Sequence, residues 1–461
     1  MSDAADPRGA TRTETDSLGP REVPDRAYWG VSTLRAVENF PITGRTVGSL
    51  RSLVWALGVI KYSAAGVNED LGLLPPEVAG AIRAAAREVQ TGRFDDQFVV
   101  DLIQGGAGTS TNMNANEVIA NRSLELLGRP RGDYRTVHPI DHVNRSQSTN
   151  DVYPTAAKLA LARQVQGLAD EHRLLAESFA RRGEAFRGIY KVGRTQLQDA
   201  VPMTLGQEFR AFAATLTEDR LRLDELLPHL METNLGATAI GTGITAPAGF
   251  RERVVQAVAE ESGLPVVSAA DLVEATSDAG VFLLVSGILK RAAVKLSKIC
   301  NDLRLLSSGP QSGLGEITLP AVQAGSSIMP GKVNPVIPEV VNQVAFRVVG
   351  ADSTITLAAE AGQLQLNAFE PVMVAELHEV TGMLTSACRQ LRQRCVEGIE
   401  PNVEMLSERM QGSISVITGL APHIGYGRAA ELAKAAHRST HAADATDAEL
   451  SAEAESAARS S

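Results

Sequence analysis

One segment in the second half of the sequence limits the fold more than any other. It begins with Thr276-Ser277-Asp278, residue types that commonly cap the start of a helix, and it stops at Gly309-Pro310, which commonly ends one. The sequence between these signals predicts a helix of about 30 residues, roughly 45 Å long. Such a helix is longer than is typical of globular proteins, so the fold must provide long packing partners for it.

The middle third of the sequence has the spacing of a helix that packs along another helix. Intervals of 4-3-4-3 separate Leu161, Val165, Leu168, His172 and Leu175. A similar pattern continues at Phe209, Phe212, Leu216, Leu223 and Leu226, and another helical pattern follows Pro335 to about Leu366. Aromatic residues make up only 4% of the chain, and alternating strand-like runs are few. The predicted fold class is therefore all-α, with a central bundle of long helices.

The length of 461 residues corresponds to about two to four domains. We expect an N-terminal domain over residues 1–149, the central bundle over 150–400 and a small C-terminal domain over 401–461. The first 20 residues are rich in Asp, Arg, Gly, Thr and Ser and predict a mobile arm. Residues 439–461 contain too few large apolar side chains to pack a helix, which predicts disorder.

The charge balance excludes some classes of partner. Lys and Arg number 44 against 54 Asp and Glu, which gives a formal net charge of −10. A protein that binds nucleic acid or anionic lipid through its overall electrostatic field needs a basic chain, so the sequence argues against these partners. The sequence begins without an apolar run and has no long apolar window, so we expect a cytoplasmic protein without a secretory signal or membrane span. Cys300, Cys388 and Cys395 match no metal or redox spacing, and we expect reduced thiols.

Four segments interrupt the helical patterns with small polar residues and glycine. They are QGGAGTSTNMNANEVIANR (104–122), HPIDHVNRSQSTNDVYPT (138–155), GRTQLQDAVPMTLGQEF (193–209) and AGSSIMPGKVNP (324–335). Any one of them could be an ordinary loop or helix cap. Together they offer hydroxyls, amides and a single lysine, a set that suits a small polyanion held by many neutral donors and one cation.

The segment from Gly325 to Pro335 is the most informative of the four. Two glycines and two prolines punctuate a loop ahead of a helix. Its backbone N–H groups, Lys332 and Asn334 could stabilise negative charge, and a serine in such a loop could ionise more easily than a free serine.

These segments resemble motifs of the aspartase/fumarase superfamily, and among its members the ammonia-lyases that act on L-aspartate. The pattern GSSxMPxKxN is reproduced from Gly325 to Asn334. Further similar motifs are RAVENFPITG, GTSTNMNANEVIANR, DHVNRSQSTNDVYPT, GRTQLQDAVPMTLGQEFRAF, NLGATAIGTGI, EATSDAG, KICNDLRLLSSGP and EAGQLQLNAFEPV. The resemblance covers about residues 20 to 437. It implies a homotetramer with a core of long helices, active sites built from three chains, and reversible anti-elimination of ammonia from L-aspartate to give fumarate without an organic cofactor.

The resemblance also implies a role for each matching residue. Ser326 would be the base that removes a proton from Cβ, and the carbanion would delocalise into the neighbouring carboxylate as an aci-form. The donors around that β-carboxylate would be Thr109, Ser148, Thr149 and Ser327. The α-carboxylate would be held by Thr195, Lys332 and Asn334, and Asn150 and Gln196 would lie near the amino group. Spacing alone does not separate Ser326 from Ser327 as the base, and no metal site is predicted.

Two sequence differences favour an ammonia-lyase over a fumarate hydratase. Fumarases of this superfamily carry histidine where this chain has Gln196, and typically a second serine where it has Thr149. An α-ammonium of pKa about 7.7–8.0 departs as neutral ammonia, whereas hydroxide needs a general acid. Fumarate hydratase, a lyase that releases another nitrogen group from a C4 dicarboxylate, and a structural protein of the crystallin kind remain the alternatives.

Two departures from the superfamily pattern are present. Ile140 replaces the asparagine of a His-Pro-Asn-Asp segment, which in fumarases forms a secondary dicarboxylate site, so such a site is doubtful here. After Tyr426, the usual C-terminal continuation is missing, which predicts a shortened C-terminal domain.

Overall fold

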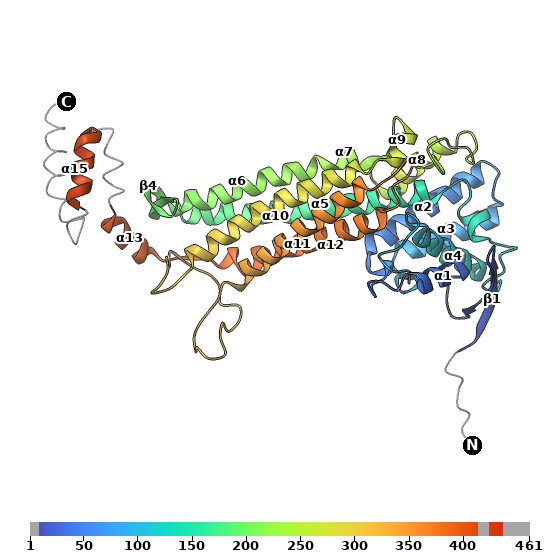
Figure 1. The fold of residues 1–461 in the computed structure, drawn as a ribbon, viewed down its shortest axis with the longest axis horizontal. Coiled ribbons are helices and arrows are strands. Elements are labelled where there is room, and N and C mark those ends of the chain that lie inside the picture. Colours follow the sequence, from blue (N-terminus) through green and yellow to red (C-terminus); the bar gives the residue numbers. More distant parts are fainter. Residues whose placement is uncertain (1–8, 414–423, 437–461) are drawn as a thin grey trace, which may run out of the picture. The chain divides into compact units, whose positions relative to one another are not determined.

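The computed structural model describes residues 9–413 and 424–436. Most of them are helical, as predicted (Figure 1). The α-helices are α1 (Val31–Asn39), α2 (Arg51–Asp70), α3 (Pro76–Gln90), α4 (Thr109–Leu126), α5 (Thr149–Ala185), α6 (Leu205–Asp224), α7 (Leu226–Met231), α8 (Phe250–Ser262), α9 (Leu272–Ser277), α10 (Gly280–Leu306), α11 (Val336–Glu360), α12 (Glu370–Arg394), α13 (Val403–Gly412) and α15 (Tyr426–Ala436). The disorder predicted for 439–461 lies outside the described residues.

The described strands are short and occur only in two-stranded sheets. The antiparallel pairs are β1 (Thr11–Asp16) with β2 (Gly19–Pro24), β3 (Tyr190–Thr195) with β4 (Gln198–Thr204), and β7 (Ile317–Thr318) with β8 (Glu400–Pro401). β5 (Glu232–Thr233) and β6 (Val267–Ser268) pair in parallel. The all-α class is therefore confirmed, because no sheet among the described residues is large enough to form a layer of the fold.

The chain separates into two compact units. Unit 1 consists of Met1–Ala169, Leu221–Arg291 and Phe346–Met383, and unit 2 consists of Asp170–Arg220, Ala292–Ala345 and Leu384–Ser461. Helices α5, α6, α10, α11 and α12 contribute residues to both units. The three domains expected from the sequence, 1–149, 150–400 and 401–461, stay a prediction.

In unit 1, the long helices contact one another through polar groups as well as apolar ones. The Gln164 amide of α5 donates to the His378 carbonyl of α12 at 3.4 Å, and Lys290 of α10 pairs with Asp352 of α11 at 2.5 Å. Helices α2, α3, α4 and α8 also belong to this unit, with α2 packed against both α3 and α8.

In unit 2, the same long helices supply a second set of contacts. The Phe179 ring of α5 lies 5.6 Å from the Phe212 ring of α6, and Lys298 of α10 lies over that Phe212 ring. The Asn342 amide of α11 donates to the Ser297 hydroxyl of α10 at 2.8 Å. Each unit therefore contains packed segments of long helices, as the bundle prediction requires.

The helical spacing seen in the sequence marks the core. Every member of both predicted stripes is buried: Leu161, Val165, Leu168, His172, Leu175, Phe209, Phe212, Leu216, Leu223 and Leu226. The three cysteines are free, in agreement with the reduced thiols that the sequence predicts, and all three are buried. Burial raises the pKa of Cys395 to about 12 and raises the pKa of the Cys388 thiol as well, which disfavours the thiolate form of both.

The ends of two predicted helices differ from the prediction for identifiable reasons. Thr276 lies in the separate short helix α9, and α10 starts at Gly280, whose N–H donates to the Asp278 carboxylate at 2.8 Å. Helix α11 ends at Glu360 rather than near Leu366. The Asn367 side-chain amide donates to the carbonyls of Ala358 and Ala359, and so satisfies the last turn of that helix.

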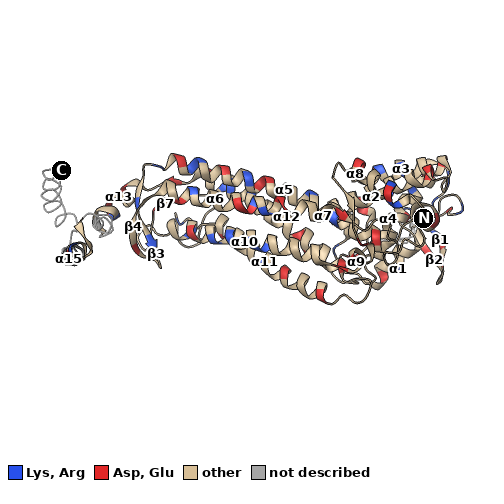
Figure 2. Ribbon diagram, turned by 90° about the horizontal axis from the view of Figure 1, so that it is seen from above, with Lys and Arg blue, Asp and Glu red and all other residues tan. Residues whose placement is uncertain are grey.

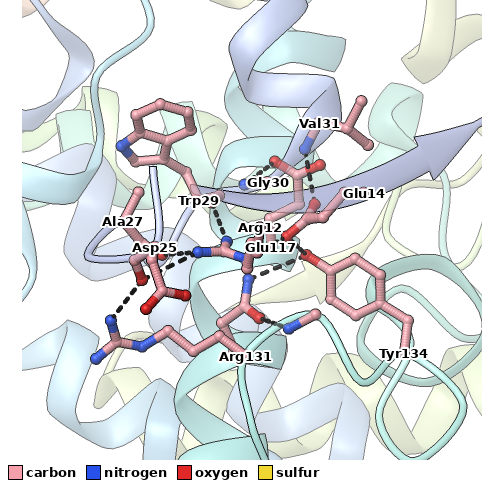
Figure 3. A network of polar contacts seen from close by, with 12 residues as sticks. Arg12, Glu14, Asp25, Ala27, Trp29, Gly30, Val31, Glu117, Arg131 and Tyr134 are labelled. Atoms are coloured by element: carbon pink, nitrogen blue, oxygen red, sulfur yellow. Dashed lines mark hydrogen bonds and ion pairs between the residues drawn. The ribbon is translucent and has the colours of Figure 1, made fainter. Parts of the chain in front are cut away.

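Residues 11–24 form the β1–β2 hairpin where a mobile arm was predicted. The Arg12 guanidinium donates to the carbonyls of Ala27 and Trp29 at 2.9 and 2.8 Å, and the buried Glu14 carboxylate accepts from the Val31 N–H and the Tyr134 hydroxyl (Figure 3). The composition of this segment is polar, but its Arg12 and Glu14 side chains bond to other parts of the chain. Residues 1–8 lie outside the described residues.

The charges of the described residues are mixed in sign. Figure 2 shows Lys and Arg interspersed with Asp and Glu along the long helices, without a continuous basic stripe in that view. Among the described residues, no helix combines the length and the apolar character that a bilayer span requires.

Candidate functional site

Ser148, Thr149 and Asn150 form the start of the 37-residue helix α5 in unit 1. The Ser148 hydroxyl accepts from the Asn150 N–H at 3.2 Å, and the Ser148 N–H donates to the Asp151 carboxylate at 3.0 Å. This reciprocal arrangement is a capping box, which fixes the direction of the first helical turn. The positive end of the helix dipole lies at these residues, an environment that favours a bound carboxylate.

The turn after β5 is attached to this helix start. Asp151 is fully buried, and its second carboxylate oxygen accepts from the backbone N–H groups of Gly236 and Thr238 at 3.2 and 2.9 Å. The Asn150 amide donates to the Ala239 carbonyl at 2.7 Å. The sequence GATAIGTG therefore forms a turn that positions the start of α5.

Thr109 approaches the same region of unit 1 from the start of helix α4. Its hydroxyl donates to the Gly106 carbonyl at 2.7 Å, and the helix is preceded by Gly108 with φ of 84°. A Cβ at Gly108 would lie 2.4 Å from the Tyr153 ring of α5, so only glycine permits this close approach. One turn later, the Asn112 amide donates to the Thr149 hydroxyl at 3.0 Å, which connects α4 to the start of α5.

A fully buried lysine lies behind these residues. Lys61 of α2 donates to the Asn144 and Gln147 side-chain oxygens at 2.8 and 3.0 Å, and Asn144 also accepts from the Asn112 amide at 3.1 Å. Burial lowers the pKa of Lys61 to about 7, although the charge of Asp151 opposes that shift. Burial likewise raises the pKa of Asp151 to about 7, against its hydrogen bonds and the charge of Lys61. Burial thus disfavours the charged form of each group, and the opposite charge of the other group partly restores it.

Thr195 and Gln196 lie in unit 2, at the tip of the β3–β4 hairpin. Thr195 pairs with Gln198, so Gln196 and Leu197 are the two turn residues, with φ of 53° and 63°. Two-residue hairpin turns of this hand favour glycine and asparagine, and a non-glycine residue in this conformation costs about 1–3 kcal/mol. Gln196 and Leu197 therefore have strained backbone conformations and exposed side chains at the hairpin tip, a combination that is typical of functional positions.

Buried ion pairs fix the base of this hairpin. The Glu316 carboxylate accepts from Lys191 at 2.6 Å and from Arg194 at 2.5 Å, and its side chain is almost completely buried. Burial favours the neutral acid, but the hydrogen bonds and charges of Arg194 and Lys191 prevail and lower the pKa of Glu316. Glu316 therefore holds β3 as a charged anchor.

The segment from Gly325 to Asn334 closes on itself in unit 2. The Gly325 N–H donates to the Lys332 carbonyl at 2.8 Å, and the Asn334 amide donates to the Gly325 carbonyl at 2.7 Å. A Cβ at Gly325 would lie 2.5 Å from the Lys332 carbonyl oxygen, which explains the glycine. The Ser326 hydroxyl oxygen accepts from the N–H groups of Ile328 and Met329 at 3.2 and 3.0 Å. These two donors can stabilise negative charge on that oxygen.

Lys332 and Asn334 line a cavity of about 670 Å³ within unit 2. Its walls also include Arg304, Ser308 and Asn402. The lining also includes apolar residues such as Ile317 and Leu319, and its two cationic residues, Arg304 and Lys332, can meet an anionic group of a ligand. The Lys332 ammonium has no ion-pair partner among the residues that the structure describes, and it is free to meet an anion.

The predicted site residues thus occur in two groups. Unit 1 brings together Thr109, Ser148, Thr149 and Asn150 around Asn112 and Asp151. In unit 2, Thr195 and Gln196 lie at the tip of the β3–β4 hairpin. Ser326, Ser327, Lys332 and Asn334 lie on the loop of residues 325–334 in the same unit.

The sequence analysis missed Lys61, Asn112 and Asp151. Signals in the sequence could have pointed to Lys61 and Asp151, but none points to Asn112. Lys61 continues the apolar spacing of Leu53 and Leu57 by one turn, which places a charge on a buried helix face. Ser148 and Asp151 have the spacing of a capping box.

Comparisons with known proteins agree with the motifs of the sequence and with the helical fold. A family model described as "Lyase" matches residues 19–350. An aspartate ammonia-lyase of Pseudomonas aeruginosa is 55% identical over 431 residues, which cover 93% of this chain and 91% of the relative. A crystal structure titled fumarate lyase:delta crystallin from Brucella melitensis, bound to cobalt, has a TM-score of 0.93 and 55% identity, covering 95% and 96% of the two chains. A class II fumarase from Schistosoma mansoni has a TM-score of 0.91 and 35% identity, covering 96% of each chain.

Proposed function

Because the chain belongs to the lyase family of the aspartase/fumarase superfamily, we propose that it is an aspartate ammonia-lyase, which converts L-aspartate to fumarate and ammonia. The identity of 55% to an enzyme of that name supports this activity over that of the fumarase, which is 35% identical. The structural observation that carries the proposal is the Ser326 hydroxyl oxygen with its two backbone N–H donors.

In the proposed reaction, Ser326 acts as the base. Its Oγ, as an alkoxide stabilised by the Ile328 and Met329 N–H groups, takes a proton from Cβ of L-aspartate. The electron pair of that C–H bond passes into the β-carboxylate as an aci-form. It then forms the Cα–Cβ double bond as the Cα–N bond breaks and ammonia leaves. The Ser327 hydroxyl has no comparable pair of backbone donors among the described contacts, which favours Ser326 as the base.

The remaining predicted residues would bind the substrate. Hydrogen-bond donors directed at charge that grows in the transition state lower the barrier more than donors that only bind the ground state. We propose that Thr109, Ser148, Thr149 and Ser327 contact the β-carboxylate, that Thr195, Lys332 and Asn334 hold the α-carboxylate, and that Asn150 and Gln196 lie near the amino group. The capping box of α5 and the closed loop of 325–334 keep these donors in place before substrate arrives.

The proposed site takes residues from several copies of the chain in a homotetramer. The sequence resemblance motivates this proposal, and exposed apolar residues on α11 support it: Phe346 is 67% exposed, Val349 40% and Leu357 70%. Their spacing places them along one side of the helix, a pattern that another helix can cover. Light scattering should give a mass of four chains in solution, and a monomer at micromolar concentration would contradict the shared site. The proposed location is the cytoplasm.

An assay with two substrates tests the proposed activity. The purified protein is mixed with L-aspartate and, separately, with L-malate, and fumarate is followed by its ultraviolet absorbance. We expect fumarate from L-aspartate and little from L-malate, because Gln196 cannot act as the general acid that a hydroxide leaving group needs. Fumarate from L-malate alone would identify a fumarate hydratase, and fumarate from neither would favour another nitrogen leaving group or a structural role.

Replacing Lys332 with alanine should mainly weaken substrate binding. A hydrogen bond to a charged group is worth about 1.5–3 kcal/mol, so we expect KM for L-aspartate to rise by about 10–150-fold with a smaller change in kcat. Lys298→Ala is the matched control, because that lysine pairs with Asp302 on the surface of α10 and its side chain is 70% exposed. Equal KM values for the two variants would place the carboxylate elsewhere.

A further inference from the structure

The cavity that Lys332 and Asn334 line in unit 2 has no acidic residue among the lining residues that the structure describes. Its charged side chains are those of Lys332 and of Arg304, which lies in the last turn of α10. Three other cavities in the described part of the chain each include at least one Asp or Glu side chain. In a chain with a formal net charge of −10, this cavity therefore carries a local surplus of positive charge.

Arg304 forms no ion pair with any residue that the structure describes; its side chain contacts two neutral amides instead. Other arginines of unit 2 do pair with acids: Arg194 lies 2.5 Å from Glu316, and Arg392 lies 3.1 Å from Glu397. Arg304 is also an exposed residue, so a ligand in the cavity can reach its guanidinium. An accessible arginine without a carboxylate partner, beside a lysine in the same state, indicates a place for an anion.

Neutral side chains hold the Arg304 guanidinium in place. Its Nη1 group donates to the side-chain oxygen of Asn342 at 3.2 Å and to that of Asn301 at 3.5 Å. Asn342 of α11 is only 3% exposed, and its amide nitrogen donates to the Ser297 hydroxyl at 2.8 Å, which fixes the direction of its oxygen. The Nε and Nη2 groups of Arg304 donate to none of the described residues. These two groups form one edge of the guanidinium, whose spacing matches the two oxygens of a carboxylate.

The same edge of another arginine in this chain already binds a carboxylate. Arg122 donates through Nε and Nη2 to the two oxygens of Glu88 at 2.8 and 2.9 Å. On the proposed function, the α-carboxylate of L-aspartate lies in the cavity near Arg304, because Lys332 and Asn334 line that cavity. Resting on that function, we propose that Arg304 is a further substrate-binding residue, which holds the α-carboxylate through Nε and Nη2 together with Lys332.

Succinate is a suitable probe because it is a C4 dicarboxylate without an amino group to lose, so its binding is measured without turnover. Isothermal titration calorimetry with the full-length protein gives its dissociation constant, and steady-state kinetics gives KM and kcat for L-aspartate. Arg304→Gln removes both the charge and the donor edge, whereas Arg304→Lys keeps a charge at the end of α10 without the edge. Arg187→Gln is the matched control, because Arg187 also belongs to unit 2 and pairs with Glu184 while its side chain is 73% exposed. Light scattering checks that each variant assembles as wild type does.

We expect Arg304→Gln to bind succinate at least about tenfold more weakly than wild type, and to raise KM for L-aspartate by a similar factor with a smaller change in kcat. Arg304→Lys should lose less affinity than Arg304→Gln, and Arg187→Gln should match wild type. Equal succinate binding by Arg304→Gln and wild type would overturn the proposal. An equal loss in Arg187→Gln, or no binding of succinate to wild type, would overturn it as well.

The two kinds of measurement separate this proposal from the proposed function. If wild type forms no fumarate from L-aspartate but Arg304→Gln still weakens succinate binding, the ammonia-lyase activity is contradicted and Arg304 keeps its role toward a dicarboxylate. If wild type forms fumarate and Arg304→Gln leaves both KM and succinate binding unchanged, only the role of Arg304 is contradicted.

Discussion

Ser326→Ala is expected to lower kcat for L-aspartate by about 10²–10⁴-fold, because the variant has no group to take the Cβ proton. The fold should be unchanged, since the Ser326 hydroxyl is part of an exposed loop and the loop ends are joined by Gly325, Lys332 and Asn334. Steady-state kinetics with fumarate detection measures the loss, and circular dichroism and light scattering confirm that the protein is still folded and assembled.

Ser327→Ala is the adjacent control for this experiment. Ser327 is proposed to donate to the β-carboxylate, so its removal should reduce kcat less than removal of the base. A larger loss in Ser327→Ala than in Ser326→Ala would exchange the two roles. An unchanged kcat in Ser326→Ala would remove Ser326 as the base, whatever the effect at Ser327.

The second large effect is expected at the buried Lys61. Lys61→Met leaves the Gln147 oxygen without its donor, removes one of the donors to the Asn144 oxygen, and leaves Asp151 without a nearby cation. The unsatisfied Gln147 oxygen and the buried Asp151 carboxyl without a compensating charge should lower the free energy of unfolding by about 3 kcal/mol. Urea denaturation measures this change. KM for L-aspartate should also rise, because Thr149 is positioned by Asn112, which shares the Asn144 oxygen with Lys61.

Lys298→Met is the matched control for Lys61→Met. The Lys298 side chain is 70% exposed and pairs with Asp302 one helical turn away, an interaction of about 0.3–0.5 kcal/mol. If both variants lose the same small amount of stability, the Lys61 ammonium is not part of a coupled network. If Lys61→Met is destabilised but keeps the wild-type KM, the network supports the fold without positioning Thr149.

The sequence predicts the fold well where periodicity is strong. The seam from Leu161 to Leu175 is buried as the 4-3-4-3 spacing requires, because a regular helix places those residues on one side. Prediction fails where tertiary contacts decide the structure. The hairpin of residues 11–24 depends on Arg12 and Glu14 bonding to groups that are distant in sequence, which composition does not reveal.

The residues of the candidate site also differ in how well the sequence predicts them. Its loop residues, such as Ser326 and Lys332, stand out in the sequence because glycine, proline and small polar residues are concentrated around them. Lys61 and Asn112 lie within helices and act through partners on other elements, so their place in the network follows only from three-dimensional contacts.

The left-handed turn at Gln196 and Leu197 has a consequence for engineering this protein. The substitution Leu197→Gly would relieve the backbone strain of the left-handed conformation at this position. A single change at the tip of the β3–β4 hairpin should therefore raise the thermal stability of the protein. The same relaxation would let the Gln196 side chain sample more orientations. Selection for thermal stability and selection for catalytic turnover should therefore favour different residues at this tip.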